Sequence, residues 1–337
     1  MIAAAGALSP VAAEPVADFY KGKSIRIVVA YGAGGGYDEY ARLIGRHLGR
    51  HLGGTASTPN VIVQNMPGAG GMTAALHVAA IAPQDGTVIG AIDSALPFLP
   101  LHDPSQTRFD PLAQHWLPSP VTDTALLIVW HTAPIQRIEE ARDKEILLGS
   151  SSPNATSSMY TRVLNAVLGT RFRIVLGYAS ATEAMLAMER GEIHGFPSIP
   201  WSTLKATKPD WIREGRLRYL VQFGPRPHPE APASTPFAPD LITSEADRAL
   251  LALAIGPAVL GKPYMLGAGV PAERVAFMRA AFAAMLKAPE FIADADRQRL
   301  ELDPAAPSGE EVAALLARSF ASPAAVRSRL QALYSGK

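Results

Sequence analysis

The feature that most constrains the fold is an alternation of short β-branched runs and amphipathic stretches, joined by glycine-rich turns. Residues 25–30 form such a run, glycines dominate the turn 32–36, and apolar residues recur with a 3.6-residue period over 38–52. The same pattern returns over 61–81. Strands that alternate with helices through short turns predict a mainly parallel sheet covered by helices. The predicted fold class is therefore α/β.

Two proline-rich stretches, 97–120 and 225–239, interrupt this alternation and read as connections between lobes. A second set of strands and helices lies between them, and a helical tail follows, which we expect to pack back on the first lobe. At about 150 residues per domain, a chain of 337 residues fits two lobes. The predicted division is 18–123 with 226–337 for lobe one, and 124–225 for lobe two.

Charge and cysteine content exclude several classes of function. The chain has 31 Lys and Arg against 30 Asp and Glu, so it lacks the broad basic field that holds nucleic acid or an anionic membrane. Without cysteine it has no disulfide, no thiolate metal site and no cysteine nucleophile. His47 and His51 have the spacing of metal ligands, but the glutamate of H-E-x-x-H is missing, which favours an ordinary amphipathic helix. We expect no cofactor, no metal and no nucleic-acid partner.

The N-terminus resembles the end of an export signal. Residues 1–13 carry no charge and end in small residues, although a basic segment is missing. The alternative is a disordered, Ala-rich end. We assign 1–17 to one or the other. No later segment reaches the roughly 18 apolar residues of a membrane span, Leu250–Leu260 being the nearest. These features predict an exported protein that is not embedded in the membrane.

The glycine turns are candidate anion sites. Each follows a predicted strand and precedes a predicted helix, so backbone N–H groups and a helix N-terminus converge there, and glycine permits close approach of a ligand. Neither turn completes a nucleotide motif, because Tyr37 and Thr73 stand where the last glycine is required. The alternative is a plain tight connection. Asp38 is expected to cap the first helix, whereas Glu39 adds negative charge that competes with an anion.

The second lobe repeats the arrangement with capping residues. Ser152 before Pro153 is expected to cap one helix, and Ser180 with Glu183 fits a capping box for the next, which Gly191 ends. Capping alone explains both junctions. We nevertheless predict that four strand-to-helix junctions, two from each lobe, face one crevice.

An ordered set of motifs runs through the chain: YKGKSIRIVV at 20–29, GGGYD at 34–38, NMPGAGG at 65–71 and APQDG at 82–86, with weaker likeness at 177–178, 189–192, 215–218 and the helix after Pro271. This set resembles the periplasmic substrate-binding receptors of tripartite tricarboxylate transporters, also called Bug-type proteins. The resemblance implies a two-lobed Venus-flytrap fold with a hinge, of the type II-like periplasmic-binding-protein kind. It also implies a small organic acid ligand, delivery to transporter membrane subunits, and a periplasmic location. We expect a monomer.

The resemblance further implies that a ligand carboxylate meets backbone N–H groups of the two glycine turns, while junctions of the other lobe reach it from the opposite side. The predicted ligand contacts in lobe one are Tyr31, Gly32, Ala33, Gly34, Gly35, Gly36, Tyr37, Asp38, Asn65, Gly68, Ala69 and Gly70. Those in lobe two are Ser150, Ser151, Ser152, Asn154, Thr156, Tyr178, Ala179, Ser180, Ala181, Pro197, Ser198 and Trp201. The family often has other residues at Tyr31, Tyr37 and His194. With Trp201, Tyr37 suggests an aromatic or larger carboxylate.

Two other functions remain open. The protein could present its ligand to a membrane sensor kinase instead of a transporter. An enzyme on a similar scaffold would need an activated nucleophile, a metal or a cofactor, and the segment Gly191–Gly195 lacks the serine of a nucleophile elbow. We therefore expect a binding protein and not an enzyme.

Overall fold

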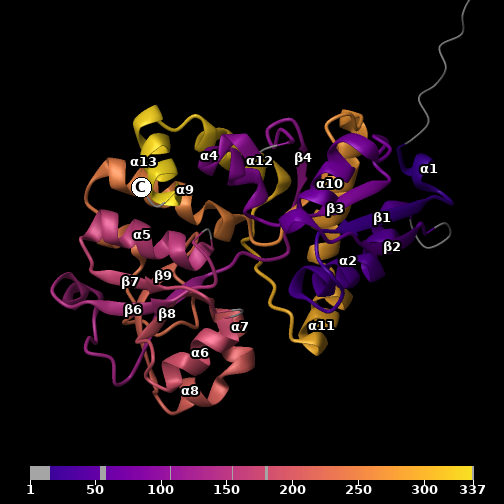
Figure 1. The fold of residues 1–337 in the computed structure, drawn as a ribbon. Helices are drawn as coiled ribbons and strands as arrows, with labels where there is room; N and C mark the ends of the chain where they lie inside the picture. The colour runs from indigo at the N-terminus through magenta and orange to yellow at the C-terminus, as the bar shows by residue number, and fades with distance from the viewer. Residues whose placement is uncertain (1–15, 54–57, 107, 154, 179–180, 336–337) are drawn as a thin grey trace, which may run out of the picture.

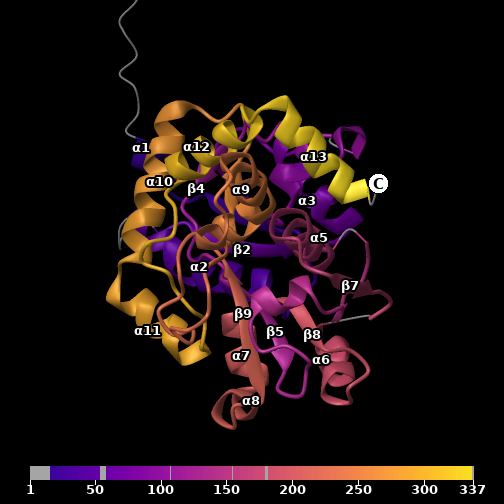
Figure 2. The same ribbon diagram turned by 90° about the vertical axis from the view of Figure 1, so that its left-hand side faces the viewer.

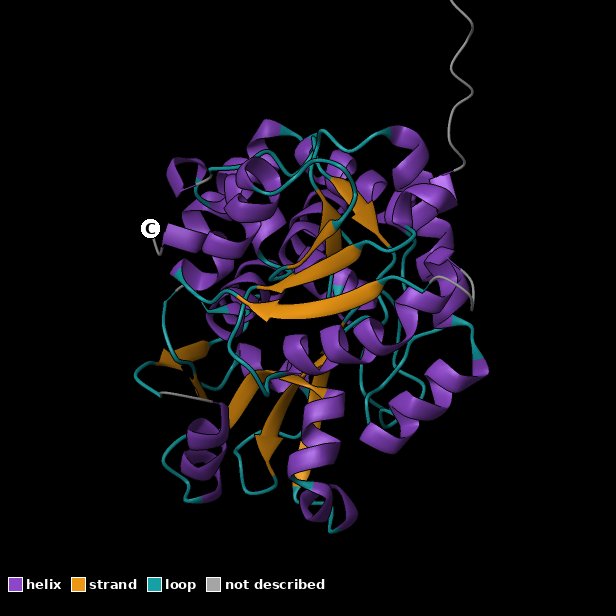
Figure 3. Ribbon diagram, turned by 90° about the vertical axis from the view of Figure 1, so that its right-hand side faces the viewer, coloured by secondary structure: helices purple, strands orange, loops and turns teal. Residues whose placement is uncertain are grey.

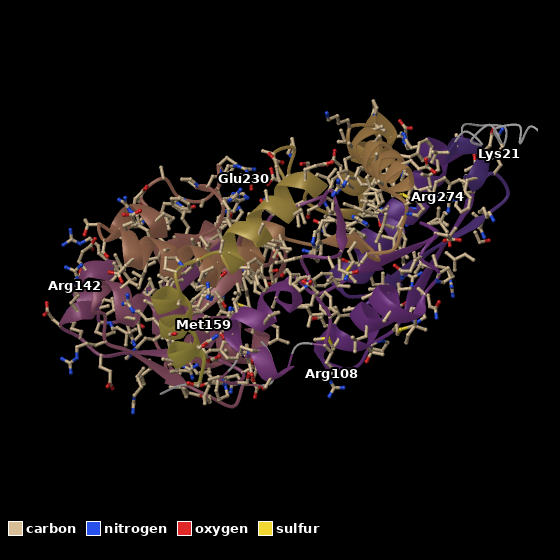
Figure 4. All side chains as sticks on the ribbon, turned by 90° about the horizontal axis from the view of Figure 1, so that it is seen from above. Lys21, Arg108, Arg142, Met159, Glu230 and Arg274 are labelled. Atoms are coloured by element: carbon tan, nitrogen blue, oxygen red, sulfur yellow. The ribbon has the colours of Figure 1, made fainter. Side chains whose placement is uncertain are left out.

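The computed structural model (Figure 1) describes residues 16–53, 58–106, 108–153, 155–178 and 181–335. Its strands form two five-stranded sheets, each flanked by helices (Figure 3). Seen from above, the molecule is elongated, with Lys21 near one end and Arg142 near the other (Figure 4). The α/β fold class predicted from the sequence is confirmed. Of the predicted signal-peptide remnant 1–17, only Val16 and Ala17 are described, and they belong to the first helix.

The first sheet is mixed, and one of its five strands, β10 (Tyr264–Leu266), runs opposite to the other four. Its order is β2 (Asn60–Asn65), β1 (Ser24–Val29), β3 (Val88–Ala91), β10 (Tyr264–Leu266) and β4 (His115–Leu117). β1 pairs in parallel with β2 and β3, while β10 runs antiparallel to β3 and β4. Ile25, Ile27, Val28 and Val29 of β1 are fully buried, as expected for a central strand covered on both faces.

The helices around this sheet are α1 (Val16–Tyr20), α2 (Gly36–Gly53), α3 (Met72–Leu76), α4 (Leu99–His102), α10 (Ala272–Leu286), α11 (Pro289–Gln298) and α12 (Gly309–Phe320). A π-helical turn, His77–Ile81, continues α3. Short 3₁₀ turns occur at Ala69–Gly71, Leu96–Phe98, Pro104–Gln106, Ile138–Arg142 and Ala238–Leu241. α10 and α11 pack against α2, and α12 packs against β4, so this part of the tail returns to the first sheet as expected.

The second sheet has the order β7 (Phe172–Val175), β6 (Ile146–Gly149), β8 (Gly195–Pro200), β5 (Ala125–Trp130) and β9 (Leu217–Phe223). β6 is parallel to β7 and β8, whereas β5 is antiparallel to β8 and β9. Its helices are α5 (Thr156–Leu168), α6 (Ala181–Glu189), α7 (Trp201–Thr207) and α8 (Pro209–Arg213).

Two helices of the tail link the lobes. α9 (Glu245–Leu260) and α13 (Ala324–Ser335) both contact α5 of the second lobe, and α13 also contacts α4 of the first (Figures 1 and 2). One apolar cluster accordingly runs from Val28 of the first sheet to Leu127 of the second. The expectation that the tail packs on the first lobe was therefore incomplete for these two helices, and the residue limits of the lobes stay a prediction.

The connections between the sheets leave from particular edges. Tyr264, the first residue of β10, pairs with Ala91 at the end of β3 and with Leu117 at the end of β4. The connectors 118–124 and 261–263 therefore both meet the first sheet at the edge where its parallel strands end. The glycine turns after β1 and β2 lie at this same edge.

The second sheet is joined in the same way. Ala125, the first residue of β5, pairs with Pro200 at the end of β8 and with Phe223 at the end of β9. Because β6, β7 and β8 are parallel, their following loops share this edge. Loops at the carboxyl ends of parallel strands are the usual ligand sites of open α/β sheets. Both sheets present these loops on the edges where the connectors join them.

The connectors also pack on each other. The N–H of Asp123 donates to the Ala258 carbonyl oxygen at 3.0 Å, and the N–H of Lys262 donates to the Ser119 hydroxyl oxygen at 3.3 Å. Residues 118–124 and 261–263 thus form a bonded pair between the lobes, which we call the hinge pair. Within the described part of the chain, no helix has both the length and the apolar character that a membrane crossing requires.

Candidate ligand-binding site

The first glycine turn is held by a carboxylate inside the following helix. α2 begins at Gly36, so Gly35 and not Asp38 occupies the capping position, and the predicted cap was wrong. The Asp38 side chain instead reaches back one turn and accepts a hydrogen bond from the Gly34 N–H at 2.8 Å. N–H groups in the first turn of a helix have no acceptor within the helix. The amides of Gly36 and Tyr37 therefore have no acceptor within α2.

Asp38 also ties the two glycine turns together. It is 2% exposed and accepts hydrogen bonds from Arg42 Nε at 2.8 Å and from Asn65 Nδ2 at 2.9 Å. Asn65 ends β2, and its Nδ2 donates to the Tyr31 carbonyl oxygen as well. Burial by itself would raise the pKa of Asp38, but the hydrogen bonds from Arg42, Gly34 and Asn65 outweigh it and lower the pKa. The carboxylate stays charged, and Arg42 neutralises it.

Replacing Asp38 with asparagine is expected to reduce the free energy of unfolding by about 2 kcal/mol at pH 7, because an amide group would face the donors of Arg42 or Asn65. A lowered folded-state pKa stabilises the protein above the unfolded-state value near 4, and that contribution is lost as the pH falls through the folded-state pKa. The difference between the proteins should therefore shrink below pH 4. Urea unfolding at several pH values measures it.

The matched control is Asp210→Asn, which removes an exposed carboxylate paired with Arg213. Exposed pairs contribute little, so this variant should unfold almost like the wild type at every pH. Equal losses in the two variants would contradict the role assigned to Asp38.

The second glycine turn contains four successive residues with positive φ, of which only Ala69 is not glycine. Gly68, Ala69, Gly70 and Gly71 have φ values of 140°, 47°, 62° and 90°. A Cβ on Gly68 would lie 2.7 Å from Thr73 Oγ1. Left-handed residues in succession are costly and persist where the surroundings require them, often at ligand sites. The turn is compatible with close approach of a ligand to the main chain.

A third loop, after β3, completes this edge of the first sheet. The Tyr31 hydroxyl donates to Asp93 Oδ2 at 2.5 Å, and the Ser94 N–H donates to the Tyr37 hydroxyl oxygen at 3.0 Å. The two tyrosine rings lie 5.1 Å apart. Burial raises the pKa of Asp93, although the hydrogen bonds it accepts from the Tyr31 hydroxyl and from the Ala95 and Leu96 amides act to lower it. Sequence reasoning did not find Asp93 or Ser94, because no motif marks them.

In the second lobe, the loop after β6 is folded on itself. Ser150 is 1% exposed, and its Oγ lies 2.6 Å from Ser157 Oγ and 2.7 Å from Ser158 Oγ. The Ser158 hydroxyl donates to the Ser152 carbonyl oxygen at 2.6 Å. α5 begins only at Thr156, so the predicted cap at Ser152 was wrong: the Ser152 carbonyl is used by this turn before the helix starts.

Other predicted contacts of the second lobe differ in their surroundings. Ser151 and Ser152 are exposed, and Tyr178 is partly buried. Asn154, Ala179 and Ser180 lie outside the described residues, as does the predicted capping box, while Ala181 begins α6. Pro197 and Ser198 lie within β8.

Trp201 and His194 have structural contacts. Trp201 is 5% exposed, packs in the apolar cluster of the second lobe, and donates from Nε1 to Glu230 Oε2 at 3.2 Å. Glu230 lies in the upper part of the view in Figure 4. His194 accepts a hydrogen bond from the Leu147 N–H through Nδ1 at 2.9 Å, and burial lowers its pKa. Both side chains thus stabilise the packing of the second lobe.

One charged residue beside the first turn was also missed. Lys262 of the hinge pair places Nζ 4.9 Å from the centroid of the Tyr40 ring and 3.7 Å from Asp123 Oδ1. Its position before β10 follows from strand pairing across 173 residues of chain, from Ala91 to Tyr264. Local sequence offers only the Gly261-Lys262-Pro263 turn as a signal.

A cavity of about 850 Å³ lies next to the hinge pair, but its lining contains none of the predicted contacts. Pro118, Ser119 and Pro120 form one wall, and residues 300–304 form another. Among the described residues, no group of three His, Asp or Glu side chains could hold a metal. His47 bonds to Asp294 at 3.0 Å and packs edge-on against Phe291, as an amphipathic helix residue does.

Comparison with known proteins identifies this architecture. No protein-family model matches the chain. It is similar to a UPF0065 protein of Cupriavidus necator, with 27% identity over 234 residues that span 66% of this chain and 67% of the relative. A UPF0065 protein of Bordetella bronchiseptica is 32% identical over 198 residues, spanning 56% of this chain and 55% of the relative.

Solved structures are similar to most of this chain. A TctC solute-binding protein from Polaromonas superposes with a TM-score of 0.72 at 20% identity, covering 94% of this chain and 100% of the other. The protein has the fold of the TctC and Bug-type solute-binding proteins. The periplasmic binding protein BugD gives 0.56 at 18% identity, covering 94% and 98% of the two chains. MatC of Rhodopseudomonas palustris with bound malate gives 0.55 at 19% identity, covering 93% and 99%.

The TctC-type fold confirms the two-lobed, periplasmic-binding-protein architecture predicted from the ordered motifs. Of these structural relatives, the TctC protein is described as a solute-binding protein and BugD as a periplasmic binding protein. In this fold the glycine turns of the chain lie at the edge of the first sheet from which the hinge pair leaves.

Proposed function

We propose that this protein is a periplasmic receptor that binds a small organic carboxylate between its lobes and delivers it to the membrane subunits of a tripartite tricarboxylate-type transporter. The observation that carries the proposal is the placement of amide-bearing loops at the carboxyl ends of the parallel strands of both sheets. The connectors join the sheets at these same edges, so both sets of loops adjoin the region where the lobes meet.

The chemistry of these loops supports an anionic ligand. The amides of the first α2 turn, which have no acceptor within the helix, supply hydrogen-bond donors at the positive end of the helix dipole. Asp38 is neutralised by Arg42, and Asp93 accepts the Tyr31 hydroxyl, so each carboxyl group has a partner of its own. A small acid would therefore meet main-chain donors first.

The comparisons support the ligand class and the location. MatC, which shares the fold, binds malate, a small dicarboxylate. BugD is described as a periplasmic binding protein. The transporter partner is inferred from the family resemblance of the motifs. A receptor that serves a sensor kinase would use the same site, so a pull-down with the ligand-loaded protein as bait distinguishes the two membrane partners.

A thermal-shift screen against mono- and dicarboxylic acids, aliphatic and aromatic, tests the proposal. At least one acid should raise the melting temperature, and calorimetry should give a dissociation constant of about 1 μM, on the order of −8 kcal/mol. The aromatic arm is included because the rings of Tyr31 and Tyr37 lie side by side at the site, 5.1 Å apart and tilted by 31°. Small-angle scattering should show compaction as the lobes close.

The diamide of the best diacid is the matched control, since it keeps the shape and removes the charge. Binding of the diamide as tightly as the acid, or no response to any carboxylate, would contradict the proposed function.

A further inference from the structure

Lys262 places an ammonium group beside the first glycine turn. A Cβ on Gly36 would lie 3.4 Å from Lys262 Cε. Nζ lies 5.8 Å from the centroid of the Tyr37 ring and 4.9 Å from that of Tyr40. The side chain is only 15% exposed. Its charge therefore faces the first turn of α2 with little water to screen it.

The contact between the Lys262 ammonium and the nearby Asp123 carboxylate is long. Among the described residues, Asp123 is the only carboxylate within 4.0 Å of Nζ, at 3.7 Å. A direct charge-assisted hydrogen bond would be about 2.7–2.9 Å. Asp123 belongs to the other connector of the hinge pair, residues 118–124. Nζ can therefore take a closer anionic partner by weakening only this long contact.

The other charged side chains at the turn do not supply a positive charge for an anionic ligand. Arg42 is committed to Asp38, to which Nε donates at 2.8 Å. Asp93 accepts the Tyr31 hydroxyl, and Glu39 is exposed in the first turn of α2. An anion bound at the turn would thus meet acidic neighbours. Lys262, whose Cε lies 3.4 Å from a Cβ built on Gly36, supplies the opposing charge at this turn.

We propose that Lys262 is the charge-recognition residue of the site: its ammonium binds a carboxylate of the ligand and gives up Asp123 in exchange. The residue selects anionic ligands over uncharged ones of the same shape. This inference rests on the proposed function. Lys262 and Asp123 lie on the two connectors of the hinge pair. The exchange of Asp123 for the ligand carboxylate therefore takes place where the lobes are joined.

The test is calorimetry on four variants with the acid found in the screen, in low and high sodium chloride. Lys262→Gln should weaken binding by about tenfold or more, and Lys262→Arg should restore most of it, because the charge is kept. Asp123→Asn should tighten binding several-fold, since the competing carboxylate is removed. The salt dependence of the wild type should be reduced in Lys262→Gln.

Lys208→Gln is the matched control. Lys208 Nζ also lies over an aromatic ring, 4.2 Å from the Trp211 centroid, but Lys208 directly precedes α8 in the second lobe. Its loss removes the same charge and should leave binding unchanged.

The outcomes separate the two proposals. If the wild type binds an acid and Lys262→Gln binds it as Lys208→Gln does, the role of Lys262 is overturned while the receptor function stands. If the wild type binds no carboxylate, both are overturned. Should circular dichroism show that Lys262→Gln is unfolded, Asp123→Asn decides: tighter binding supports the exchange, and unchanged or weaker binding overturns it.

Discussion

Replacing Gly261 with alanine is expected to lower the free energy of unfolding by about 3 kcal/mol or more. Gly261 has φ 59° and ψ −104°, a conformation that only glycine adopts without strain. A Cβ there would lie 1.9 Å from the carbonyl oxygen of Val121 on the other strand of the hinge pair. Because the obstacle is a backbone atom, no side-chain rotation relieves the clash, and the two connectors of the hinge pair must separate.

Thermal unfolding measures this loss, which should appear as a decrease in Tm of roughly 5 °C or more. Gly191→Ala is the matched control, since Gly191 also has a positive φ, 76°, but nothing lies within 4 Å of the added Cβ. That variant should lose only about 1 kcal/mol from backbone strain. If both variants lose the same stability, the close approach of the two strands is not what requires glycine at 261.

Gly261→Ala is also expected to affect ligand binding. Separation of the hinge strands would move Lys262 away from α2, because Lys262 follows Gly261 directly and donates its N–H to Ser119. Gly261→Ala should therefore weaken acid binding as well as stability, whereas Gly191→Ala should not.

Local patterns predicted the elements that lie at the site. The run 25–30 became β1 (Ser24–Val29), and the period over 38–52 became α2 (Gly36–Gly53), because β-branched runs and apolar stripes are properties of neighbouring residues. The glycine turn between them followed for the same reason. These elements place the first half of the candidate site without any long-range information.

Contacts between distant residues could not be predicted in this way. Asp38 looked like a helix cap because capping is a local rule, but Asn65, 27 positions away, and the Gly34 amide draw its side chain back toward the turn. Lys262 reaches the site only because β10 pairs with β3. Such positions are fixed by the packing of the whole fold, and a single sequence contains no direct record of them.

The packing of α9 and α13 has the same origin. Their apolar faces are visible in the sequence, but nothing local says whether they cover the first lobe or α5 of the second. The structure places them against both lobes, and one apolar cluster is continuous from the first lobe through these helices to the second. The two lobes therefore share apolar packing against α9 and α13 in addition to the hinge pair.

Replacing Gly35 with valine is expected to weaken acid binding at least about 100-fold while leaving the unliganded protein nearly as stable as the wild type. Nothing lies within 4 Å of a Cβ built on Gly35, and its φ is not among the positive values, so valine fits the free structure. Its branched side chain would, however, project from the residue that precedes α2. There it would occupy the space through which a carboxylate approaches the amides of the first turn.

Calorimetry with the acid from the screen and thermal unfolding without it measure the two effects separately. Gly35→Ala provides a graded control: its single methyl group should cost less affinity than valine and the same small amount of stability. Since the turn needs glycine here for access and not for its own conformation, affinity and stability should respond independently. If Gly35→Val bound the acid as tightly as the wild type, the first turn would be a tight connection only, and the ligand would have to be held by other loops.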